Sequence, residues 1–157
     1  MAKIIMLCGK ICSGKTTFAK DYIKKNGGVL LSVDEIMLKI FGQHCGEMHD
    51  FYAEKIKFYL LEKSLELNSA GVDVILDWGF WKSEDRKAVR KYFFDKNIPV
   101  SLGYLNVSEE NQEKYIEARN EKVMKNEAQA YFIDENLLNK FENLFEFPKE
   151  NEVDFYI

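Results

Sequence analysis

Apolar stretches alternate with amphipathic stretches along the whole chain. The run KIIMLC at 3–8 is almost entirely apolar, which is typical of a parallel strand buried on both faces. Similar runs predict three further strands and a C-terminal edge strand, at 29–33, 72–76, 99–107 and 153–157. Because helical patterns separate these runs, we expect an α/β fold in which a mostly parallel sheet is covered on both faces.

Apolar residues recur at helical spacing between the predicted strands. This pattern predicts helices at about 14–25, 35–41 and 50–68, from Ser83, at 108–125 and from Asp134. Ser83 is of a residue type that favours the N-cap of a helix. The sequence shows no repeat or low-complexity stretch, so we expect a single domain over residues 1–157, with one sizeable core.

Composition narrows the class of protein and its surroundings. Apolar residues make up 46% and charged residues 31%, as in folded globular domains rather than disordered chains. The net charge of −4 makes nucleic acid a possible but not a favoured partner. Three cysteines without a C-x-x-C pair speak against a disulfide framework, and no apolar run reaches the roughly 20 residues of a membrane span. We therefore expect a cytoplasmic protein without a membrane partner.

The stretch GKICSGKT at 9–16 fits the pattern G-x-x-x-x-G-K-[ST] of a nucleotide phosphate loop. Its glycines allow the backbone amides to converge on phosphate oxygens, and the following helix adds its unpaired N–H groups. Lys15 is expected to reach the β and γ phosphates, and the Thr16 hydroxyl to bind Mg²⁺. The residues expected to bind the nucleotide are Gly9, Lys10, Ile11, Cys12, Ser13, Gly14, Lys15, Thr16 and Thr17.

Two aspartates follow predicted strands at the edge of the sheet where Gly9 also lies. Asp77, at the end of VILD, could hold Mg²⁺ beside Thr16, or it could simply close a strand. Asp34, in LLSVDEI, could accept a proton from an acceptor hydroxyl as the phosphoryl group is transferred. Asp34 could equally cap the helix that follows it, and the two uses can coexist.

The chain length and one missing motif separate the classes of phosphate-loop protein. A motor or large ATPase needs more chain to couple hydrolysis to movement, and a GTP switch needs a guanine-reading motif such as N-K-x-D. The chain of 157 residues lacks both the extra length and the N-K-x-D motif. A short chain with an acid after the second strand therefore favours a kinase.

Several stretches together resemble the small P-loop kinases that are similar to zeta toxin, chloramphenicol phosphotransferase and the kinase domain of polynucleotide kinase. They are CGKICSGKTTFAK, LLSVDEI, VILDWGFW, EARNEK and the terminal FENLFEFPKENE. The resemblance implies a three-layer P-loop kinase fold with strand order 2-3-1-4-5, a helical lid at about 108–133, and ATP with Mg²⁺. It also implies that Asp34 activates the acceptor hydroxyl and that Arg119 in EARNEK grips the phosphates. The alternative for Arg119 is a solvated charge on a helix.

The sequence departs from the family pattern at one lid position. A second arginine often follows four residues after the first, but Val123 stands there, and lysine neighbours offer a point charge rather than a planar fork. Arg86, near the start of its helix, could touch ATP or substrate, or be a surface charge. Trp78 could face the acceptor pocket, or belong to the core. The loop HCGEMH at 44–49 has too few ligands for the usual zinc pattern and is a better candidate for lining that pocket.

The function expected from these features is an ATP- and Mg²⁺-dependent kinase that phosphorylates a hydroxyl of a small molecule. Lys15 and Arg119 would stabilise charge, and Asp34 would orient or deprotonate the acceptor. Two alternatives remain. One is a 5′-hydroxyl kinase acting on a polynucleotide, and the other is a binding module that holds ATP without turning it over. Neither the acceptor nor the oligomeric state follows from the sequence.

Overall fold

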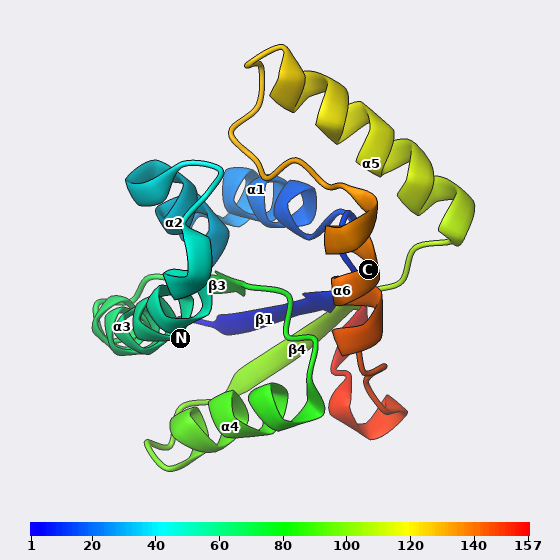
Figure 1. Ribbon diagram of the computed structural model, residues 1–157. Coiled ribbons are helices and arrows are strands. Elements are labelled where there is room, and N and C mark those ends of the chain that lie inside the picture. The colour runs from blue at the N-terminus through cyan, green and yellow to red at the C-terminus, as the bar shows by residue number, and fades with distance from the viewer.

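A five-stranded parallel sheet forms the centre of the computed structural model, which describes residues 1–157 (Figure 1). Its order is β2-β3-β1-β4-β5, and every neighbouring pair is parallel. The strands are β1 (Ile4–Gly9), β2 (Val29–Ser32), β3 (Val74–Asp77), β4 (Val100–Leu105) and β5 (Phe155–Tyr156). The predicted order 2-3-1-4-5 and the C-terminal edge strand are therefore confirmed.

Six α-helices connect the strands and cover the sheet. They are α1 (Lys15–Asn26), α2 (Val33–Phe41), α3 (His49–Ser69), α4 (Ser83–Phe94), α5 (Glu109–Met124) and α6 (Glu135–Leu144). Two short 3-10 turns lie at Gly46–Met48 and Glu150–Glu152. In Figure 1, α1 lies above the sheet and α4 below it, while α5 projects away from the sheet on the side of α1. None of these helices is both long and apolar enough to cross a membrane.

Alternate residues of β1 face the two sides of the sheet, because successive side chains of a strand point in opposite directions. Met6 is fully buried and packs in a cluster with Phe93 of α4. Leu7 is fully buried in a second cluster with Ala19 of α1. Burial on both faces explains why the β1 sequence is a continuous apolar run.

Neighbouring residues cap the start of α6, whereas a residue far along the chain binds the start of α4. Asp134 caps α6 by accepting a hydrogen bond from the Leu137 amide, at 2.8 Å. Ser83 does not cap α4, contrary to the expectation, because it is already the first helical residue. Its amide donates to the carboxylate of Glu146 instead, at 2.8 Å. A partner 63 residues away in the chain thus replaces the local cap.

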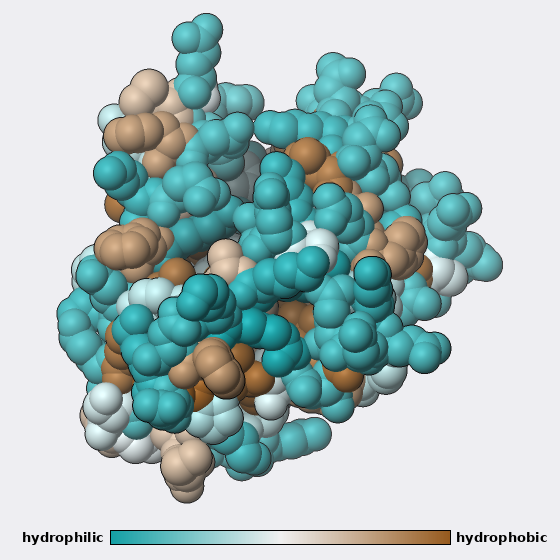
Figure 2. All heavy atoms as spheres, turned by 90° about the horizontal axis from the view of Figure 1, so that it is seen from below, coloured by the Kyte–Doolittle hydropathy of each residue, from teal (hydrophilic) through white to brown (hydrophobic).

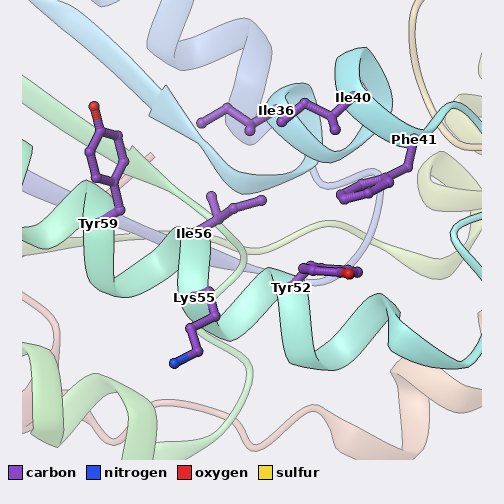
Figure 3. A pocket seen from close by; sticks show the side chains of 7 residues that line it. All are labelled: Ile36, Ile40, Phe41, Tyr52, Lys55, Ile56 and Tyr59. Carbon is purple, nitrogen blue, oxygen red and sulfur yellow. The ribbon is translucent and has the colours of Figure 1, made fainter.

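The surface seen from below in Figure 2 is mainly hydrophilic, with apolar side chains in small groups. An apolar hollow of about 330 Å³ lies between α2 and α3 (Figure 3). Across it, the rings of Phe41 and Tyr52 are stacked with their centroids 4.9 Å apart. No residue of the predicted phosphate loop and neither predicted aspartate lines this hollow. It is therefore separate from the crevice in which the candidate chemistry gathers.

Candidate functional site

The phosphate loop connects the end of β1 to the start of α1. Gly14 precedes the helix with φ of 95°, in the left-handed region that favours glycine. A Cβ atom on Gly9 would lie 2.5 Å from Ser13 Oγ and 2.8 Å from the Leu105 carbonyl oxygen. Both glycines are therefore required for the loop to close tightly at the N-terminus of α1, where unpaired amides favour anions.

Lys15 folds back over this loop. Its Nζ atom donates to the carbonyl oxygens of Gly9, at 2.9 Å, and Lys10, at 2.6 Å, and to Ser13 Oγ, at 3.2 Å. Burial lowers the pKa of Lys15, although the nearby Asp77 carboxylate acts in the opposite direction. The ammonium group thus lies within the loop, and its contact with the β and γ phosphates stays a prediction.

Thr16 and Asp77 come together at the edge of the sheet. The Thr16 hydroxyl donates to Asp77 Oδ2 at 2.8 Å, although the residues are 61 positions apart. Asp77 is the last residue of β3 and is only 6% exposed. A hydroxyl and a carboxylate are the hard oxygen ligands that Mg²⁺ prefers, so this pair fits the ion that the family implies.

Asp34 lies in the first turn of α2, but it does not cap that helix. Ser32 is the N-cap, and its hydroxyl accepts a hydrogen bond from the Glu35 amide at 3.3 Å. No protein group forms a hydrogen bond with the Asp34 carboxylate, and the residue is exposed to the solvent of the crevice. The capping alternative is therefore wrong, and this carboxylate is free to bind a ligand.

The surroundings of Asp34 raise its pKa above the usual aspartate range. Desolvation of the carboxylate by nearby protein is the main cause, even though the side chain is open to solvent, and the negative charge of Asp77 adds to it. The positive charges of Arg119, Lys15 and His49 act in the opposite direction. An acid with a raised pKa beside several cations is the kind of group that general base catalysis uses.

Arg119 reaches the crevice from α5. Its Nε atom donates to the carbonyl oxygen of Tyr131 at 3.1 Å, and its Nη1 atom lies 3.7 Å from Cys12 Sγ of the phosphate loop. Arg119 thus lies against the loop, 107 residues away from Cys12 in the chain. Val123 follows one helical turn later on α5, so α5 supplies no second arginine there.

Three polar side chains hold the phosphate loop to α5 and α6, and the sequence did not indicate two of them, Gln112 and Glu142, as site residues. The buried Gln112 donates to the Ile11 carbonyl oxygen at 2.8 Å and to Glu142 Oε1 at 3.2 Å. Lys10 Nζ donates to Glu142 Oε2 at 2.7 Å. The side chain of Lys10 is therefore engaged with the protein. The one sequence signal for Glu142 is that this acid stands between apolar residues in FENLF.

Arg86 differs from the expectation that it touches ATP or substrate. It is only 1% exposed, and its guanidinium donates to the carbonyl oxygens of Phe80, Trp81 and Glu146 at 2.9 to 3.2 Å. It also pairs with the Glu152 carboxylate, at 3.3 Å. Arg86 therefore connects α4 to the loop after β3 and to the C-terminal segment, which is a structural role.

Trp78 lies mainly in the core. It packs against buried residues of two clusters, one on the α4 side of the sheet and one formed by α2 and α3. Its ring centroid is 5.1 Å from that of Phe80. Because part of the side chain remains exposed, a contact with the acceptor remains a prediction.

His49 and Tyr131 are two further side chains near Asp34 that the sequence did not single out as a pair. Tyr131 Oη and His49 Nε2 lie 3.5 Å apart, with the rings in an edge arrangement. Burial raises the pKa of Tyr131 to about 12, and the charge of Asp34 contributes. The loop at 44–49 thus meets the segment after α5 beside the candidate base.

Comparison of the sequence with protein families and curated proteins gives one result. The AAA_33 family model, described as AAA domain, matches residues 4–148, which is most of the chain. No curated protein matches the chain significantly.

Solved structures with the same fold include several kinases. A sugar kinase from Janibacter sp. HTCC2649 has 18% identity and a TM-score of 0.64, with 100% of this chain and 85% of that chain covered. The APS kinase CysC from Mycobacterium tuberculosis, in complex with AMPPNP and APS, has 16% identity and a TM-score of 0.64, with 99% and 87% covered.

A chain of the Pnkp1/Rnl/Hen1 complex also matches, with 23% identity and a TM-score of 0.63. The match covers 72% of the present chain but only 38% of the other chain, so most of that protein has no counterpart here. At these identities the similarities establish the fold alone.

Proposed function

The chain belongs to the AAA_33 family of P-loop kinases, and from this premise we propose that it transfers the γ-phosphoryl group of ATP to a hydroxyl of a small molecule. The observation that carries the proposal is the Asp34 carboxylate. It has no hydrogen-bond partner in the protein. The positive charges of Arg119 and Lys15 lower its pKa and so favour the deprotonated form. A nucleotide-binding module without an acceptor has no need of a free carboxylate at this position.

The proposed reaction is a single in-line displacement. The acceptor oxygen forms a bond to the γ-phosphorus, the bond from that phosphorus to the β–γ bridging oxygen breaks, and ADP leaves. Asp34 takes the proton of the acceptor hydroxyl. Lys15 and Arg119 stabilise the negative charge on the phosphoryl oxygens.

The magnesium ion would be held by Thr16 and Asp77. When bound, Mg²⁺ neutralises charge on the β and γ phosphates. The loop amides and the N-terminus of α1 orient the phosphates, so this part of the catalysis consists of positioning and charge stabilisation.

Transfer of radioactive label from γ-labelled ATP tests the proposal. The protein is incubated with Mg²⁺ and a panel of sugars, nucleosides, other hydroxylated metabolites and short oligonucleotides. We expect label on a small molecule, together with one ADP released for each product formed. A Lys15→Met variant should give neither, because it lacks the cation within the phosphate loop.

Two other outcomes would replace the proposal. Label at the 5′ end of an oligonucleotide, with binding that weakens steeply as salt rises, would indicate a polynucleotide kinase. Tight ATP binding without any transfer would indicate a binding module. The acidic net charge of −4 makes the first of these the weaker alternative.

A further inference from the structure

The segment at 130–133 lies between α5 and α6 and has no regular secondary structure; we call it the strap. Side chains, rather than a neighbouring strand, satisfy most of its backbone polar groups. Gln43 binds Ala130 O and Phe132 N, Arg119 binds Tyr131 O, and Asn120 binds both Ile133 N and Ile133 O. Because backbone groups seek partners, these three side chains fix the course of the strap.

Two of the three side chains belong to the lid itself. Asn120 and Arg119 are neighbours on α5, so their bonds hold the strap against its own helix. Gln43 is different, because it lies just after α2 and is 87 residues away from Ala130 in the chain. It is therefore the side chain that joins the backbone of the strap to the body of the protein.

The Gln43 amide binds the strap in the way that a paired strand would. Its Nε2 atom donates to the Ala130 carbonyl oxygen at 2.6 Å, and its Oε1 atom accepts from the Phe132 amide at 3.1 Å. Two bonds from one planar group restrict both the distance and the direction of approach. The contact between Tyr131 Oη and His49 Nε2, at 3.5 Å, joins the strap to the body at a second point.

The residue between the two atoms that Gln43 binds is Tyr131, whose carbonyl oxygen accepts from Arg119 Nε. The same guanidinium lies against Cys12 of the phosphate loop. We propose that Gln43 is a positioning residue, which holds Arg119 beside the phosphates of ATP through the strap. The inference rests on one part of the proposed function, which is that Arg119 binds ATP.

A double-mutant cycle on ATP affinity tests this inference. Fluorescent ATP is titrated into wild type, Gln43→Ala, Arg119→Ala and the double variant. Removing the direct charge contact in Arg119→Ala should weaken binding on the order of tenfold, and Gln43→Ala should weaken it by about threefold to fivefold. In the Arg119→Ala background, the Gln43 substitution should have no further effect.

Gln129→Ala is the matched control. Gln129 is an exposed glutamine next to the strap and forms no hydrogen bond with the protein, so its removal should leave ATP affinity unchanged. Hydrogen exchange provides a reading that does not depend on ATP. The Phe132 amide should exchange faster in Gln43→Ala, while the midpoint of thermal unfolding stays at the wild-type value, because Gln43 is exposed.

The outcomes separate failure of the inference from failure of the proposed function. Absence of ATP binding by the wild type would end both. ATP binding without phosphoryl transfer would end the proposed function, while a non-additive cycle would still support the positioning role. The inference would be overturned if Gln43→Ala weakened ATP binding equally in the wild-type and Arg119→Ala backgrounds. It would also be overturned if Gln43→Ala weakened ATP binding in neither background.

Discussion

Asp34 is the residue whose chemistry depends most on its neighbours. Protein packing and the charge of Asp77 raise its pKa, while Arg119, Lys15 and His49 lower it. A general base must be deprotonated before it can accept a proton, so the sum of these effects sets the lower end of the active pH range. Its freedom from the helix cap follows from Ser32, which takes that role.

The pH dependence of the reaction should therefore respond to Arg119. In Arg119→Ala the positive charge is lost, the pKa of Asp34 rises further, and the acidic limb of the kcat/KM profile should move to higher pH. Arg119→Lys retains the charge and should keep the limb near its wild-type position while activity falls. The measurement is kcat/KM as a function of pH for the three proteins. An acidic limb at the same pH in Arg119→Ala would show that Asp34 does not limit activity there.

Among the helices and strands, some are determined by nearby residues and others depend on contacts with residues far along the chain. The apolar run of β1 and the Asp134 cap at the start of α6 determine those elements from nearby residues. The start of α4 depends on Glu146 and Glu152, which lie far along the chain and on the C-terminal side of α6. Such contacts explain why Arg86 could be taken for a cleft residue from its helical position alone.

Arg86 should be a determinant of stability. Arg86→Ala leaves the Glu152 carboxylate without its cationic partner and the Glu146 carbonyl oxygen without a donor, so we expect a loss of about 3 kcal/mol in the free energy of unfolding. For a domain of this length, that lowers the thermal midpoint by about 6 to 12 °C. Circular dichroism melting measures this change.

Arg90→Ala on the same helix is the control for Arg86. Arg90 is partly exposed, pairs with the exposed Asp154 and donates to the Glu152 carbonyl oxygen at 2.7 Å. Because exposed ion pairs contribute about 1 kcal/mol or less, its removal should cost less than that of the buried Arg86. An Arg86→Ala protein that melts no lower than Arg90→Ala would contradict the structural role. ATP affinity at low temperature should be the same in both variants, because neither arginine touches the phosphate loop in the structure.

At the scale of the whole molecule, the sheet brings residues from distant parts of the chain to one edge. Gly9, Ser32 and Asp77 end adjacent parallel strands, so α1, α2 and the loop after β3 all begin beside the same crevice. This arrangement was predictable, because the carboxyl ends of parallel strands meet. The strap was not predictable, since Gln43 and Phe132 are 89 residues apart and neither belongs to a motif.

Binding of ATP and Mg²⁺ should stabilise the whole fold. A ligand at 100 times its dissociation constant adds about 2.7 kcal/mol, which raises the thermal midpoint by about 5 to 10 °C for a domain of this size. Removal of Mg²⁺ with a chelator should reduce this shift, because we propose that Thr16 and Asp77 provide its oxygen ligands. In Asp77→Asn, ATP should still raise the midpoint, but Mg²⁺ should add little. An undiminished Mg²⁺ effect in that variant would exclude Asp77 as a ligand.

The measurement that tests the central claim most directly is phosphoryl transfer by Asp34→Asn. The substitution keeps the shape of the side chain but removes the proton acceptor. We predict that ATP raises the thermal midpoint as in the wild type, while transfer of label to the acceptor falls by about 10² or more. Glu35→Gln, an adjacent acid on α2 that pairs with Lys39 at the surface, should transfer label at the wild-type rate. Wild-type transfer by Asp34→Asn would contradict the account.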